Sequence, residues 1–286
     1  MKMYKIVCML VIIMFYSCST GSEDNKQEDI FNPSTVEGVL REVTGEWTDR
    51  IYDYTIPGQY SDIQSRRITV VLPPDYNKAT EYDAIYMHDG QNLFNYDQYG
   101  HGGWQADTTI NTLVKETSIN PLLLVCIPNA GSKREYEYTD EKTGAPHYMD
   151  YIVKRIIPVI EHNFSVKKNR EGRIIGGSSY GGVISLYAGW QYSSVFSKVI
   201  AMSPSLHKQW IVNKTLTEVK PDIKLYIDTG NLEDPDNYTN NFNIALQQIG
   251  FITDTNLKYV YGSGQDHNER AWRARLPEAL KFMVAK

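Results

Sequence analysis

The chain has 286 residues, with 29 basic and 34 acidic side chains and a formal net charge of −5. This mildly acidic balance, without a basic stripe, argues against nucleic acid as a partner. The length suits one large α/β domain behind an N-terminal leader. The cysteines are too few for a disulfide framework, so the fold has to rest on its hydrophobic core.

The first residues have the pattern of a bacterial lipoprotein leader. Lys2 and Lys5 precede an apolar run over residues 6–15, which is too short to span a bilayer, and a small residue and Cys18 follow. We therefore expect residues 1–17 to be a signal peptide and Cys18 to carry lipid. The alternative is an ordinary signal peptide with an incidental cysteine.

A polar, acidic stretch follows the cysteine and cannot bury a core. We expect residues 18–33 to be a flexible tether and residues 34–286 to form one folded domain. Cleavage after residue 17 would leave 27 basic and 34 acidic side chains, a net charge of −7. The protein is then expected to be secreted and held at the outer membrane, at the cell surface or in the periplasm, by its lipid anchor alone.

Alternating strand-like and helix-like patterns predict an α/β fold. The run at residues 121–127 is continuously apolar, as a central parallel strand buried on both faces requires. We expect a mainly parallel sheet with antiparallel N-terminal strands and helices on both faces. The predicted strands cover residues 36–47, 51–56, 66–72, 84–87, 121–127, 172–175, 198–202, 225–227 and 257–261. The predicted helices cover residues 108–115, 150–162, 241–250 and 269–284, and one more begins near residue 183.

A Gly-x-Ser-x-Gly motif, residues 177–181, lies between a predicted strand and a predicted helix. This context is typical of a nucleophile elbow, in which a strained turn exposes a serine at the end of a strand. Small neighbours let strand and helix approach, and the helix N-terminus favours negative charge. We therefore predict Ser179 as a nucleophile; the alternative is a Gly/Ser-rich turn without chemistry.

A nucleophilic serine needs a base, and the base needs a partner that fixes its tautomer. Ser179, an acidic loop and then His267 follow the chain order of α/β-hydrolases. His267 lies between the last strand and the last helix, where a loop can fold back over the sheet. For the acid, Glu233 is the first choice and Asp234 the second, while Asp228 is expected to hold the loop by accepting N–H groups.

Acyl transfer also needs donors for the developing oxyanion. One is expected to be the backbone N–H of Tyr180, and the other that of Gln91 or, next to it, Asn92. A metal site would need other ligands, and the spacing of the candidates fits no regular metal-binding pattern. Those candidates are His88, Asp89, His101 and Asp107. The sequence therefore predicts neither a metal nor another cofactor.

At these motifs the chain resembles the esterase-D-type esterases of the α/β-hydrolase fold. That family includes feruloyl and acetylxylan esterases of carbohydrate esterase family 1 and the enterochelin esterases. The resemblance implies that residues 34–286 are an α/β-hydrolase esterase domain. It places the nucleophile at Ser179, the base at His267 and the acid in the loop after Gly230. It rests on residues 67–76, 88–94, 134–136, 176–182 and 267–273.

The motifs do not specify the ester. Residues 129–147 are predicted to be a long loop near the strand ends, where Arg134 and Tyr136 are expected to contact substrate. An aromatic-edged loop on an acidic, surface-anchored protein favours acyl or feruloyl esters of plant polysaccharides. The alternatives are a siderophore esterase and a non-catalytic surface lipoprotein that binds carbohydrate.

Overall fold

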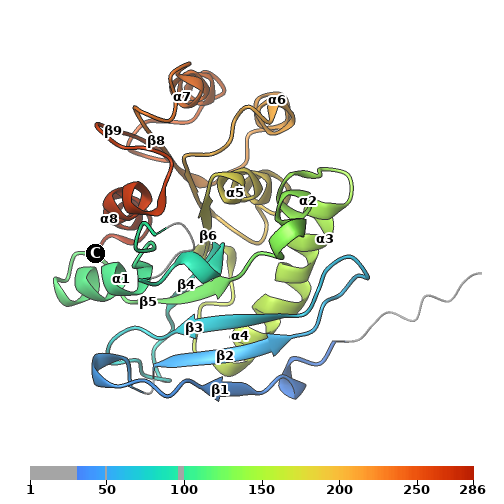
Figure 1. Cartoon of the computed structure of the whole chain (residues 1–286), viewed down its shortest axis with the longest axis vertical. Helices are drawn as coiled ribbons and strands as arrows, with labels where there is room; N and C mark the ends of the chain where they lie inside the picture. The colour runs from blue at the N-terminus through green and yellow to red at the C-terminus, as the bar shows by residue number, and fades with distance from the viewer. Residues whose placement is uncertain (1–30, 49, 96–99) are drawn as a thin grey trace, which may run out of the picture. The chain divides into compact units, whose positions relative to one another are not determined.

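The computed structural model describes residues 31–48, 50–95 and 100–286, and nine strands in this part of the chain form one mixed sheet (Figure 1). All of these residues belong to one compact unit, Phe31–Lys286. The predicted signal peptide, Cys18 and most of the predicted tether lie outside the described residues. Within the described residues, no helix is long and apolar enough to cross a membrane.

The sheet has the strand order β1-β2-β3-β5-β4-β6-β7-β8-β9. The pairs from β1 to β5 are antiparallel, and the pairs from β5 through β4 to β9 are parallel. The strands are β1 (Gly38–Leu40), β2 (Ile51–Ile56), β3 (Arg66–Val71), β4 (Asp83–His88), β5 (Leu122–Ile127), β6 (Arg173–Ser178), β7 (Lys198–Met202), β8 (Lys224–Gly230) and β9 (Leu257–Gly262).

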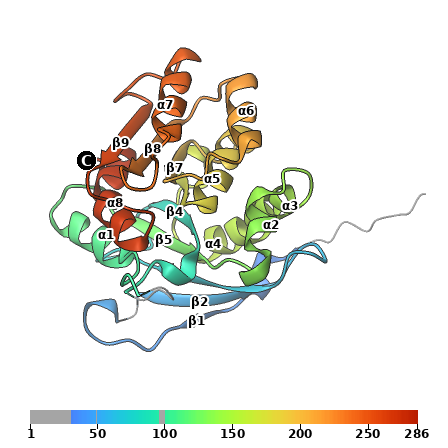
Figure 2. The same cartoon turned by 45° about the horizontal axis from the view of Figure 1, so that its top comes forward.

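Helices cover both faces of this sheet (Figures 1 and 2). Helices α1 and α8 pack on one face and α2–α7 on the other. The helices are α1 (Ala106–Lys115), α2 (Arg134–Thr139), α3 (Gly144–Tyr151), α4 (Ile157–Asn163), α5 (Tyr180–Gln191), α6 (Gln209–Thr217), α7 (Tyr238–Gln248) and α8 (Glu269–Val284). A π-helical turn, η5 (Ile152–Ile156), joins α3 to α4. The short 3₁₀ turns are η1 (Pro33–Thr35), η2 (Gly45–Trp47), η3 (Gly90–Asn92), η4 (Gly131–Lys133) and η6 (Arg170–Gly172).

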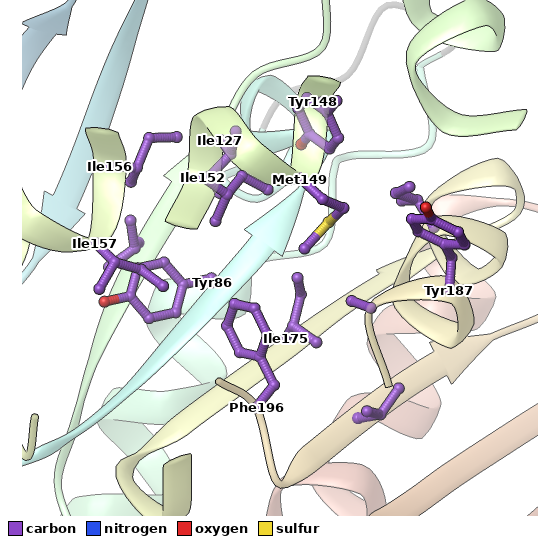
Figure 3. Close-up of a cluster of buried hydrophobic side chains, with 14 of the residues drawn as sticks. Tyr86, Ile127, Tyr148, Met149, Ile152, Ile156, Ile157, Ile175, Tyr187 and Phe196 are labelled. Carbon is purple, nitrogen blue, oxygen red and sulfur yellow. The ribbon is translucent and has the colours of Figure 1, made fainter. Parts of the chain in front are cut away.

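The central strands are buried on both faces because their successive side chains point to opposite faces of the sheet, and helices cover both faces. On β4, Tyr86 joins the core beneath α3 and η5, whereas Ile85 and Met87 join the core beneath α1 and α8. Figure 3 shows the first of these cores, in which Tyr86 and Met149 are labelled among its side chains. A continuous apolar run is therefore what such a strand needs, and the predicted fold class is confirmed.

The predicted long loop over residues 129–147 was wrong. The segment contains η4, the whole of α2 and the start of α3. Glu137 of α2 is fully buried, and its carboxylate accepts hydrogen bonds of 2.6 and 3.0 Å from Arg66 of β3. Tyr138 beside it is also fully buried. Arg66, which is distant in the sequence, thus stabilises α2, a helix that the local sequence pattern does not predict.

Three other elements differ from expectation. The strand predicted over residues 36–47 shrinks to β1, which is exposed throughout at the sheet edge. The single helix predicted over residues 150–162 begins earlier and is interrupted by η5, just before Pro158 in the first turn of α4. Proline has no N–H to donate, so the helical ladder has to be rearranged there. Helix α6 had no predicted counterpart.

Candidate active site

Ser179 lies in the turn between β6 and α5, and its backbone is strained. Its φ of 59° and ψ of −124° are outside the conformations that L-residues ordinarily adopt. Its N–H donates to the carbonyl of Met202 at 3.1 Å, which ties the turn to β7. A Cβ at Gly177 would lie 3.0 Å from the Cβ of His88, so any larger residue would force a neighbour to shift. These contacts maintain the strained backbone, which keeps Ser179 at the strand end beside the N-terminus of α5.

His267 and Glu233 are in direct contact. Nδ1 of His267 lies 2.5 Å from Oε2 of Glu233, whose side chain is 4% exposed against 40% for the histidine. Burial alone would raise the pKa of Glu233, but hydrogen bonds from His267, Ser203 and the N–H of Gly230 lower it overall. An ionised Glu233 orients the imidazole and leaves its other nitrogen, Nε2, available for another partner.

The two other acidic candidates have structural partners. Asp234 accepts hydrogen bonds of 2.8 Å from the N–H groups of both Tyr238 and Thr239, at the start of α7. It therefore satisfies helix donors that would otherwise lack partners. Asp228 is fully buried and accepts the N–H of Ser203 at 2.9 Å, in the loop-holding role expected of it. Of the two carboxylates offered as the acid, Glu233 is the one that reaches His267.

A buried serine connects Glu233 to the core. Ser203 Oγ donates to Glu233 at 2.7 Å and accepts hydrogen bonds from Trp272 Nε1 at 2.9 Å and from Arg275 Nη2 at 2.7 Å. Arg275 in turn lies 3.0 Å from Asp228 in a buried ion pair. Ser203 has a φ of 40°, so this loop also is strained. The network fixes the carboxylate of Glu233 from behind.

The loop after β4 bends sharply over the sheet into η3. A Cβ at Gly90 would lie 2.6 Å from the backbone of β5, so the loop approaches closer than any other residue allows. The N–H of Asn92 donates to Asp89 O at 2.9 Å and is already engaged, which favours Gln91 over Asn92 as an oxyanion donor. Tyr180 is the first residue of α5, where N–H groups have no intrahelical partner.

A cavity of about 320 Å³ opens in front of these groups. Ser179 and His267 both line this cavity. In the described part of the chain, their side chains are not hydrogen-bonded to each other. Ser179 Oγ lies instead 3.3 Å from the hydroxyl of Ser205. The lining residues are Asp89, Gln91, Asn92, His101, Asn129, Arg134, Ser179, His267, Glu269 and Trp272.

The two predicted substrate-binding residues have different positions. Arg134 lines the cavity, where its guanidinium donates to both oxygens of Asp89 at 2.7 and 2.8 Å. Tyr136 is not among the lining residues, and its hydroxyl donates to Asp62 at 2.7 Å. The structure thus brings Arg134, but not Tyr136, to Ser179 and His267.

Sequence reasoning did not single out the wall formed by the start of α8. Glu269 is 3% exposed, and its carboxylate accepts from the side chain of Asn92 at 3.3 Å and lies 3.0 Å from Nδ1 of His101. Trp272 lies edge-on to the His267 ring. Both residues occur in the stretch that resembles the esterase family, which was the only available signal for them. Among the described residues there is no group of three or more potential metal ligands.

The comparisons with known proteins agree with this geometry. The family model described as "Putative esterase" matches residues 63–283. The chain belongs to this family. It is accordingly a carboxylic ester hydrolase, and we refer to it as the esterase. The uncharacterized protein YbbA of Bacillus subtilis strain 168 is 24% identical to it over 247 residues, which cover 78% of the esterase and 94% of YbbA.

Solved structures share the fold of the esterase. The enterobactin esterase FES from Shigella flexneri matches with a TM-score of 0.65 at 16% identity, covering 81% of the esterase and 58% of FES. The ferulic acid esterase AmCE1/Fae1A from the anaerobic fungus Anaeromyces mucronatus matches with a TM-score of 0.60 at 17% identity, covering 87% and 96% of the two chains. These neighbours confirm an α/β-hydrolase fold.

Proposed function

We propose that the esterase cleaves its substrate with Ser179 as nucleophile, His267 as general base and Glu233 as the carboxylate that orients the histidine. The observation that carries this proposal is the contact between His267 Nδ1 and Glu233, beside a strained serine that opens into the same cavity. Catalytic contacts are often looser before substrate binds, so the contact of Ser179 with Ser205 is compatible with His267 acting as the base.

In this mechanism Nε2 of His267 takes the proton as Ser179 Oγ attacks the ester carbonyl. The N–H groups of Tyr180 and Gln91 stabilise the oxyanion of the tetrahedral intermediate. The carbon–oxygen bond to the alcohol then breaks, and His267 returns the proton to the alcohol oxygen. Water, activated by the same histidine, hydrolyses the acyl-enzyme in a second passage through the same steps.

We propose acyl or feruloyl esters of plant polysaccharides as the substrate class. The ferulic acid esterase AmCE1/Fae1A shares the fold over nearly its whole length. The acidic charge of the chain disfavours a highly anionic ligand in solution. The basic side chain in the cavity, Arg134, is paired with Asp89, which reduces its attraction for an anion.

A siderophore ester is the second candidate, because Arg134 lines the cavity and the enterobactin esterase FES is a structural neighbour. The deciding experiment compares kcat/KM on feruloylated and acetylated xylo-oligosaccharides with that on a tris-catecholate siderophore ester, iron-loaded and iron-free. We expect the carbohydrate esters to be preferred. A tenfold preference for either form of the siderophore would replace the first candidate by the second.

A binding lipoprotein that keeps the fold without turnover is the candidate from another class. A binding module has no use for an activated serine, whereas a fluorophosphonate probe reacts only with one. We expect the probe to label wild type at Ser179 and to leave Ser179→Ala unlabelled. Absence of labelling in folded wild-type protein would reject the serine mechanism.

For its location, we propose that Cys18 is lipidated after removal of residues 1–17 and that the acidic segment behind it tethers the esterase to the outer membrane. Support comes from the order of basic, apolar and small residues before the cysteine. An anchored esterase meets its substrate outside the cytoplasm, which fits a polysaccharide too large to be imported.

A further inference from the structure

A second cavity of about 320 Å³ is also lined by His267. The loops after β7 and β8 and the start of α7 form its walls. Of the described residues that line these two cavities, His267 alone lines both. The second cavity is lined by residues 203–207, Thr229, residues 233–236, Tyr238, Thr239 and His267.

Ser205 brings this second cavity to the nucleophile. Its hydroxyl lines the cavity and lies 3.3 Å from Ser179 Oγ, and its N–H donates to the Ser179 carbonyl at 3.3 Å. Gln91, the favoured oxyanion donor from the loop after β4, lines the first cavity and not the second. The second cavity therefore adjoins both His267 and, through Ser205, the nucleophile, and it has no expected oxyanion donor among its described lining residues.

The second cavity is acidic and rich in hydroxyl groups. Glu233, Asp234 and Asp236 contribute carboxylates, and none of its described lining residues is lysine or arginine. Two helix N–H groups fix both oxygens of Asp234. Asp236 is exposed to solvent. Such a wall offers many acceptors to neutral hydroxyl groups and repels a negative charge.

From these observations we infer that the second cavity binds the alcohol half of the ester and selects an uncharged, hydroxyl-bearing alcohol over an anionic one. The inference rests on the proposed function, because a general acid has to lie beside the oxygen that leaves. When the acyl–oxygen bond breaks, the electron pair stays on the alcohol oxygen and His267 supplies its proton. The alcohol therefore departs past His267, into the second cavity.

The test measures charge selectivity on the alcohol side with the full-length protein. The substrates are the acetate monoesters of ethylene glycol and of 2-hydroxyethanesulfonate, which differ mainly by one negative charge. We expect wild type to prefer the neutral ester in kcat/KM. Asp236→Lys should shrink that preference by roughly fivefold, and Asp236→Asn should shrink it less, because one reversed charge at contact range changes the interaction by that order.

Two controls isolate the side of the ester. Glu116→Lys makes the same charge change at an exposed carboxylate after α1 that lines neither cavity, and should leave the ratio within twofold. The esters monoethyl succinate and ethyl butyrate carry the charge difference on the acyl side, and Asp236→Lys should change their ratio by less than twofold. A larger effect on the acyl side would assign the cavity to the acyl group and overturn the inference.

Two further outcomes would also overturn it. In the first, both Asp236 variants hydrolyse the esters but keep the wild-type ratio of kcat/KM for the glycol ester to that for the sulfonate ester. That result would reject the alcohol-side site and leave the proposed function unaffected. A choline ester cleaved more than tenfold faster than the glycol ester reassigns the cavity to a cationic alcohol. By contrast, wild type that neither hydrolyses an aryl acetate nor reacts with fluorophosphonate removes the proposed function, and the inference falls with it.

Discussion

The carboxylate of Glu233 meets Nδ1 of His267 at 2.5 Å, although Glu233 is 34 residues earlier in the chain. The strand–loop geometry after β8 makes this possible, because the N–H of Gly230 also donates to the same carboxylate and curls the loop back. The neighbouring carboxylate of Asp234 is committed to α7. Two adjacent acidic residues thus have separate partners, which single substitutions can distinguish.

Ser179→Ala and His267→Ala are each expected to lower kcat on a simple aryl acetate by at least roughly 10³-fold, because nucleophile and base act as one unit. Circular dichroism and thermal unfolding should show an intact fold. Activity within tenfold of wild type in either folded variant would reject the assignment of these two residues.

Glu233→Gln is expected to cost more activity than Asp234→Asn. The first change removes the charge that orients His267, and the second leaves a side chain that can still accept a helix N–H. Steady-state kinetics on the aryl acetate gives the comparison, with the melting temperature of each variant as the control. The opposite order of kcat values would move the acid to Asp234.

Ser203→Ala should both destabilise the fold and lower kcat. It leaves the buried Nε1 of Trp272 without its acceptor, at a cost of about 1–3 kcal/mol, whereas Nη2 of Arg275 keeps Glu233 at 3.4 Å. It also removes a donor that holds Glu233, and a small misplacement there can cost up to roughly 10²-fold in rate. Ser185→Ala is the matched control, since Ser185 is equally buried but donates only to a helix carbonyl, that of Gly181.

The two effects of Ser203→Ala are separable by the pH dependence of kcat/KM. A serine that positions Glu233 should alter this pH profile, because its hydrogen bond helps to lower the pKa of that carboxylate. A purely structural serine would lower the melting temperature and leave the profile in place. An unchanged profile with wild-type kcat would contradict a positioning role for Ser203.

His88 should make the free energy of unfolding depend on pH. Burial lowers its pKa to about 3 from an ordinary 6.5, with Nδ1 at 2.8 Å from the Tyr148 hydroxyl. Between those values the unfolded chain gains a proton that the folded protein does not, so stability falls as pH falls, by up to about 1.4 kcal/mol per pH unit. Denaturant unfolding from pH 6 to pH 4 should show that stability changes less with pH in His88→Gln than in wild type. The control is His162→Gln, because His162 is an exposed residue of α4. Equal slopes in wild type and His88→Gln would refute the explanation.

Cys18→Ala is expected to release the esterase from membranes. In a related bacterial host, wild type should sediment with the membrane fraction and carry acyl chains by mass spectrometry, since stable anchoring needs covalent lipid. The variant should be recovered in the soluble fraction. Soluble wild-type protein of unacylated mature mass would refute lipidation.

Much of the central sheet could be predicted because its strands are buried on both faces. Residues 122–127 have to be apolar without interruption, and the pattern marks β5 to within one residue. Strand β1 carries no such requirement, as all three of its residues are exposed at the edge. The prediction therefore extended that strand too far, whereas β7 and α8 begin and end where the sequence indicates.

The candidate site was harder to predict from the sequence where it depends on residues far apart in the chain. The elbow at Ser179 and the loop at His267 each have a local signature, and their catalytic roles stay predictions. The partners of Ser203 lie about 70 residues further along, in α8, so no local pattern could reveal them. The same holds for α2, whose fully buried Glu137 is explained only by Arg66.

The buried pair of Arg66 and Glu137 has a consequence for anyone who wishes to re-engineer the specificity of the enzyme. Helix α2 carries Arg134 into the cavity, so exchanging it for the corresponding segment of a relative is an obvious graft. Such a graft would leave the buried Arg66 of β3 without its carboxylate partner, which would lower the free energy of unfolding by several kcal/mol. Strand and helix therefore have to be transplanted together, or both charges replaced at once by apolar residues of similar volume.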